Sequence, residues 1–192
     1  MAARLAIAGF LLQHPRTASE LAQLTSSHEP SLSRMMRARV KLAICTKASD
    51  GKFALTGTGT FLAAGSERSM KAWVLFEGGP LTAGWGELLE SIRTGKTADE
   101  LRGLGQERFE LLAKTKDANL FNEAMLSMTR LTVPAVLSAY SFAGISTLMD
   151  VGGGLGELMS AVLGKYSSMR GIVFDLPTAR KAQEKPFRRG SS

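Results

Sequence analysis

The apolar residues between Thr147 and Asp175 follow a pattern that predicts a strand, a tight loop, a helix and a second strand. Thr147–Val151 is a short run of β-branched and apolar residues, and three consecutive glycines follow it. Gly171–Asp175 is predicted as a second buried strand. Between the two strands, apolar residues recur at the spacing of a helix face, at Leu155, Leu158, Met159, Val162 and Leu163.

The glycine loop, Gly152–Gly156, favours a ligand without phosphate groups. Glycine at a strand-to-helix turn lets a ligand lie against the main chain, where a Cβ would collide with it. The dinucleotide fingerprint fails because Glu157 or Met159 falls at its third glycine, and no G-K-[ST] follows. Asp150 and Glu157 also place negative charge beside the turn, which would repel a pyrophosphate. A ligand with cationic character suits this loop better.

Asp175 offers a second polar group to the same site. It ends the second predicted strand, where a βαβ unit places an acidic residue beside a ribose. A plainer reading is also open, because glycine-rich turns occur as simple connections and an acid after a strand is often a solvated loop residue.

The N-terminal part of the chain combines short amphipathic helices with a hairpin. Thr17, with Glu20 three residues later, matches the capping box of a helix start. Ser49-Asp50-Gly51 is a turn signal between Ile44–Thr46 and Lys52–Leu55. Three helices before a hairpin predict a winged helix. The helices are predicted at Leu5–Leu12, Ala18–Leu24 and Ser31–Val40.

On the residues alone, this winged helix has two interpretations. In a nucleic-acid reader the third helix enters the major groove. In a dimerisation module the same helices bury apolar faces against a second subunit. Binding that weakens steeply with salt would favour the first, and salt-insensitive dimers would favour the second. The basic residues that could meet phosphates are Arg34, Arg37, Arg39 and Lys41.

The middle of the chain, residues 70–120, is predicted to be helical. A turn at Gly78–Pro80 is expected to separate two apolar faces, and the charged stretch Asp99–Asp117 is predicted as an exposed helix. Phe121 and Met125 follow, four residues apart on one helix face, a spacing at which such residues are most often core. The two apolar faces are formed by Trp73, Leu75 and Phe76, and by Trp85, Leu88, Leu89 and Ile92.

Composition narrows the class of protein without identifying a reaction. The 192 residues are 44% hydrophobic, and the net charge of +7 is concentrated near the two ends, which is typical of solvated faces or tails. The single cysteine, Cys45, cannot form an internal disulfide, so a cytoplasmic location is expected. No stretch has the length and apolar character of a membrane span, and neither a membrane nor a metal is expected as a partner.

Two motifs together resemble one enzyme family. Asp150-Val-Gly-Gly-Gly-Leu-Gly156 followed by Phe174-Asp-Leu-Pro177 is similar to the S-adenosylmethionine-binding core of the plant-type and bacterial small-molecule O-methyltransferases, the caffeic acid and hydroxyindole O-methyltransferase relatives. Thr17–Ala22 and Phe53–Gly59 resemble the N-terminal domain of that family, and Phe121–Met125 resembles its F-x-x-x-M segment. Either core motif alone would be weak evidence, whereas the pair at this spacing is specific.

The resemblance implies a cofactor, a reaction and a set of site residues. The cofactor is S-adenosylmethionine, and the reaction is methyl transfer to a hydroxyl of a small aromatic or polyketide-like acceptor. Phe121 and Met125 would lie against the methyl-bearing end of the cofactor and the acceptor, and neither a catalytic residue nor a metal ligand is assigned. The cofactor contacts of the family fall here on Asp150, Gly152, Gly153, Gly154, Asp175 and Leu176.

The implied fold is an α+β N-terminal winged-helix dimerisation domain followed by the first part of an α/β Rossmann-like S-adenosylmethionine-dependent methyltransferase domain. A homodimer through the N-terminal domain is favoured over nucleic-acid contact, although Arg37-Ala-Arg39 is more basic than the family pattern. The expected ranges are 1–70 for the dimerisation domain, 71–143 for a helical connector, 144–182 for the partial cofactor domain and 183–192 for a disordered basic tail.

The resemblance also implies that the catalytic part of the enzyme is absent. Members of the family continue past F-D-L-P with further βα units, an acceptor pocket and a histidine general base, whereas the two histidines here are His14 and His28. We therefore expect that the chain is truncated after the second strand and that it has no activity by itself. The alternative functions are a non-catalytic dimerisation fragment and a winged-helix nucleic-acid-binding protein.

Overall fold

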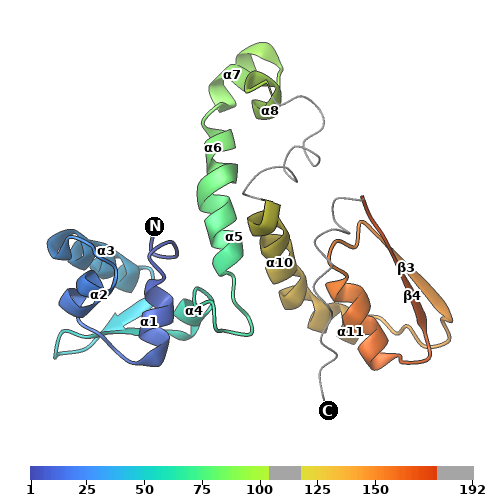
Figure 1. The fold of residues 1–192 in the computed structure, drawn as a ribbon, viewed down its shortest axis with the longest axis horizontal. Coiled ribbons are helices and arrows are strands. Elements are labelled where there is room, and N and C mark those ends of the chain that lie inside the picture. The colour runs from blue at the N-terminus through green and yellow to red at the C-terminus, as the bar shows by residue number, and fades with distance from the viewer. Residues whose placement is uncertain (104–117, 177–192) are drawn as a thin grey trace. The chain divides into compact units, whose positions relative to one another are not determined.

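The computed structural model describes residues 1–103 and 118–176, and it divides the chain into two compact units (Figure 1). The first unit is Met1–Gly79 and the second begins at Pro80. The predicted tail, 183–192, and the end of the predicted cofactor domain, 177–182, lie outside the described residues. In the described part of the chain, no helix combines the length and apolar character needed to cross a membrane.

The first unit consists of short helices and one hairpin. Its strands pair antiparallel, with Cys45 opposite Leu55, as the turn signal between them predicts. The helices and the hairpin share one apolar core, formed mainly by Ile7, Leu11, Leu21, Leu32, Met36 and Phe53. In chain order the elements are α1 (Ile7–Gln13), α2 (Ala18–Leu24), α3 (Glu29–Lys41), β1 (Cys45–Lys47), β2 (Phe53–Leu55), α4 (Gly57–Thr60) and α5 (Lys71–Phe76).

The starts of α2 and α3 follow from the chemistry of helix ends. The Thr17 hydroxyl accepts the Glu20 N–H at 3.2 Å, and the Glu20 carboxylate accepts the Thr17 N–H at 2.6 Å, so the predicted capping box is confirmed. The predicted start of the third helix at Ser31 is wrong, because α3 begins at Glu29. The first helical turn needs no N–H donor, and Pro30 therefore fits inside the helix.

The predicted turn at Gly78–Pro80 is also wrong. The chain passes from α5 into a π-helix, Glu77–Leu81, and then into α6, Thr82–Trp85. A π-helix bonds each carbonyl to the N–H five residues on, and this wider turn accommodates a proline that has no N–H to donate. Two short helices follow, α7 (Leu88–Thr94) and α8 (Ala98–Leu101). Of the charged helix predicted for Asp99–Asp117 the structure describes residues 99–103, and α8 ends within them at Leu101.

The second unit contains the predicted strand, loop, helix and strand. β3 (Thr147–Val151) and β4 (Arg170–Phe174) pair in parallel, and α11 (Glu157–Lys165) connects them. Figure 1 shows α11 beside the two strands. The contact is close, since a Cβ on Gly171 would lie 2.5 Å from the sulfur of Met159. A long helix, α10 (Ala118–Ala139), contacts α11 in turn.

Candidate functional site

The glycine loop joins β3 to α11 at the carboxyl edge of the two parallel strands. The Gly152 N–H donates to the carbonyl of Phe174 at 2.7 Å, and the Gly156 N–H donates to the carbonyl of Gly153 at 2.8 Å. The loop is therefore attached to the end of β4 as well as to β3. Ligands of open α/β sheets bind at this edge.

The glycines of the loop fall into two kinds. An added Cβ on Gly153 would lie 2.7 Å from Cγ of Asp150 and 2.9 Å from Cγ1 of Val173, so the loop rests directly on these two side chains. Gly152 and Gly154 have φ of +76° and +53°, and within residues 1–103 and 118–176 no atom lies within 4 Å of a Cβ built on either. The loop thus has one packed side and one open side, on which a ligand can lie against the main chain.

Asp175 directly follows β4, and its carboxylate binds the loop. Oδ2 accepts the Gly154 N–H at 2.6 Å, and Oδ1 accepts the N–H of Leu176 at 2.6 Å. Sequence separates Asp175 from Gly154 by 21 positions, yet the structure brings these two residues and Leu176 together. The carboxylate therefore lies directly beside the main chain of Gly154.

Asp150 lies on the packed side of the loop. Its side chain is half-buried near the end of β3 and packs against Gly153. With Asp175 it makes this edge of the sheet electronegative, which favours a cationic ligand over an anionic one. The structure thus assigns different surroundings to two carboxylates that the sequence treats alike.

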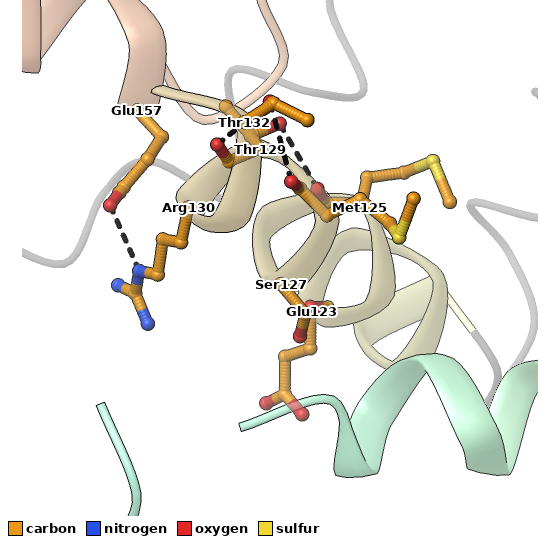
Figure 2. Close-up of polar contacts among 8 residues, drawn as sticks. Glu123, Met125, Ser127, Thr129, Arg130, Thr132 and Glu157 are labelled. Atoms are coloured by element: carbon orange, nitrogen blue, oxygen red, sulfur yellow. Dashed lines mark hydrogen bonds and ion pairs between the residues drawn. The ribbon is translucent and has the colours of Figure 1, made fainter. Parts of the chain in front are cut away.

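Arg130 is a residue of this region that sequence reasoning missed. Its Nε donates to Oε1 of Glu157 at 2.9 Å, and the two side chains are 52% and 28% exposed (Figure 2). Glu157 is the first residue of α11, immediately after the glycine loop, whereas Arg130 belongs to α10. No periodicity connects residues 27 positions apart, and this pair is therefore visible only in the structure.

The predicted acceptor residues, Phe121 and Met125, lie on α10 rather than at the sheet edge. Both are half-buried and one helical turn apart. Figure 2 shows Met125 on the same helix as Arg130. Because α10 contacts α11, this helix links the predicted acceptor residues to the element that follows the glycine loop.

Known proteins match this chain along nearly its whole length. The phenazine O-methyltransferase of Lysobacter antibioticus is 34% identical over 186 residues, which cover 96% of this chain and 54% of that protein. The crystal structure of LaPhzM has a TM-score of 0.86 at 34% identity, over 96% of this chain and 55% of that one. An O-methyltransferase from neocarzinostatin biosynthesis, in complex with S-adenosylmethionine and 2-hydroxy-5-methyl naphthoic acid, has a TM-score of 0.70 at 30% identity, covering 94% of this chain and 56% of its own.

These matches cover only part of the known proteins. The chain spans about half the length of the curated relatives it matches. The family model of the O-methyltransferase domain matches residues 85–190. This range is more than half of the chain and includes β3, the glycine loop and β4. The family predicted from the sequence motifs is confirmed, and the chain belongs to the O-methyltransferase family.

Proposed function

We propose that this chain supplies the cofactor-binding core of an S-adenosylmethionine-dependent O-methyltransferase that acts on a hydroxyl of a small aromatic or polyketide-like acceptor. The observation that carries the proposal is the open glycine loop with the Asp175 carboxylate bound to its Gly154 N–H. The relatives support it, since one is named a phenazine O-methyltransferase and another a mitomycin biosynthesis 6-O-methyltransferase. A third protein, the O-methyltransferase from neocarzinostatin biosynthesis, was solved in complex with S-adenosylmethionine.

The residues at the sheet edge fit this cofactor. No described atom would contact a Cβ on Gly152 or Gly154, which is compatible with a ligand lying against the backbone there, and the Asp175 carboxylate can accept hydrogen bonds from a ribose diol. The electronegative edge suits a sulfonium cation. When bound, the cofactor supplies an electrophilic methyl group, and the residues named here bind and orient it.

The acceptor side of the proposal rests on α10. Phe121 and Met125 offer an aromatic face and a polarisable sulfur, which are suitable neighbours for a cation and for an aromatic acceptor. Asp150 and Gly153 hold the loop in place, and Leu176 closes the turn after Asp175. The protein's contribution to the reaction is therefore orientation, for which proximity alone can supply about 7–11 kcal/mol.

The remaining ranges are part of the same proposal. Residues 1–70 form a winged-helix dimerisation domain, 71–143 a helical connector and 144–182 the partial cofactor domain, and two copies pair through the first of these in the cytoplasm. The named relatives are small-molecule enzymes, and they give the nucleic-acid-binding alternative no support.

Titration calorimetry with S-adenosylmethionine tests the site. Asp175→Ala should weaken cofactor affinity by about 1–3 kcal/mol, the range for losing a charge-assisted hydrogen bond. The matched control is Asp50→Ala, which removes an exposed carboxylate that pairs with Lys52 in the hairpin of the first unit. Equal affinities of Asp175→Ala and the parent chain would remove Asp175 from the site.

A further inference from the structure

Helix α10 has a weak point within its length. Pro134 lies inside this 22-residue helix and has no N–H, so the carbonyl of Arg130 lacks its intrahelical partner. Just before it, the Thr129 hydroxyl donates to the carbonyl of Met125 at 3.1 Å, and the Thr132 hydroxyl donates to that of Thr129 at 3.0 Å. Proline and such hydroxyl bonds are the usual causes of helix bends. The helix is therefore easiest to bend between Arg130 and Pro134.

Side chains tie α10 to α11 on both sides of this weak point. On the C-terminal side, Nζ of Lys165 donates to the carbonyl of Leu137 at 2.9 Å. On the N-terminal side, Nε of Arg130 donates to Oε1 of Glu157 at 2.9 Å, and Figure 2 shows the arginine reaching from α10 to the neighbouring helix. The first tie holds the part of α10 after Pro134. The second is placed to hold the part before it.

We propose that the Arg130–Glu157 ion pair is a positioning contact that holds the N-terminal arm of α10, residues 118–129, in register with the glycine loop across a hinge at Pro134. The inference rests on the proposed function, because that arm carries Phe121 and Met125, the proposed acceptor residues. Glu157 directly follows Gly156, so its carboxylate connects the arm to the loop itself. Neither residue of the pair needs to touch the cofactor for this role.

The location of the pair matters more than its strength. An exposed ion pair contributes little to global stability, and this one is about half exposed on the arginine side. At a hinge, however, the same small energy decides the orientation of a whole arm. The Arg93–Glu90 pair is a useful comparison, because at 2.8 Å it joins neighbouring turns of the same helix, α7, and does not connect two elements.

Substitutions in the full 192-residue chain separate these roles. Arg130→Gln should weaken S-adenosylmethionine binding about three- to fivefold in titration calorimetry, the reach of an exposed pair. Arg93→Gln is the matched control and should leave it unchanged. Adding Pro134→Ala to Arg130→Gln should recover most of the affinity, because alanine restores the N–H and stiffens the hinge. Because Pro134→Ala also stabilises the helix itself, the free energy of unfolding of each variant is measured by urea unfolding, and an affinity that only follows this free energy would indicate a role confined to stability.

Hydrogen exchange of the ligand-free chain gives a second, cofactor-independent readout. Amides of residues 118–129 and of the glycine loop should exchange faster in Arg130→Gln than in the parent and in Arg93→Gln. If the parent fails to bind S-adenosylmethionine, the proposed function falls while exchange still decides the hinge. Unchanged exchange in Arg130→Gln, or an affinity loss that Pro134→Ala does not recover, would overturn the proposal.

Discussion

Gly153→Ala probes the packed side of the glycine loop. The added methyl would lie 2.7 Å from Cγ of Asp150, 2.8 Å from its Oδ2 and 2.9 Å from Cγ1 of Val173. Carbon atoms in contact prefer about 3.5–4.0 Å, so both neighbours must move. The Cγ1 atom of Val173 can move only by an unfavourable change of its χ1 angle or by a shift of β4, and overpacking of this kind costs about 1–3 kcal/mol. We expect a loss of that size in the free energy of unfolding.

Urea unfolding followed by circular dichroism measures this loss, and two glycines serve as controls. Gly154→Ala meets no atom of the described residues within 4 Å but adopts φ of +53°, so we expect a loss set by the strain of that conformation, about 1–2 kcal/mol. Gly164→Ala, in α11 with open space around it, should gain up to about 1 kcal/mol because alanine favours helix. A Gly153→Ala chain as stable as the parent would mean that the loop does not rest on Asp150 and Val173.

Two further predictions concern ionisation and turnover. The pKa of the Tyr166 phenol lies below its ordinary value of about 10, because the Ser141 hydroxyl, the Phe142 N–H and then Lys165 stabilise the phenolate. Folding is therefore favoured further as pH rises through the lowered pKa. Ultraviolet titration in a Tyr140→Phe background should show that the Tyr166 phenol ionises below its ordinary pKa, and Ser141→Ala should raise this pKa. A titration midpoint at the ordinary value would contradict this. Expressed alone, the 192 residues should transfer no radiolabelled methyl group to catechols or hydroxyindoles. A phenol is mostly protonated at neutral pH, a positioned general base raises the reaction rate about 10²–10⁴-fold, and the described part of the second unit contains no histidine. Turnover on any acceptor would refute the expectation.

The elements around the site were predictable because each has a local cause. Three glycines after an apolar run require a turn, and the helical spacing that follows requires α11. The proximity of Asp175 to the loop follows from one rule, that parallel strands present their carboxyl ends at one edge. The predicted strand was shifted by one residue, since β4 is Arg170–Phe174. That shift leaves Asp175 outside the strand and able to turn toward Gly154.

The failures have different physical origins. The third helix was expected to begin after Pro30 and a turn was expected at Gly78–Pro80, but a first helical turn and a π-helix both accept a residue without an N–H. The ion pair of Arg130 with Glu157 depends on how two helices pack, and no local pattern records that packing. Sequence therefore predicted the elements around the glycine loop better than the course of the chain at its prolines or the contacts between packed helices.

The strands themselves illustrate the limit most clearly. Their apolar residues predict burial, yet Met149, Val151 and Phe174 are 55%, 72% and 64% exposed. Alternation and register put these three side chains on one face, and α11 packs against the other. Periodicity thus decides which residues share a face but not what covers it. Among the described residues, apolar packing stabilises one face of β3 and β4, and no second packed face offsets a steric clash at Val173. Gly153→Ala should therefore lose the full free energy of that clash.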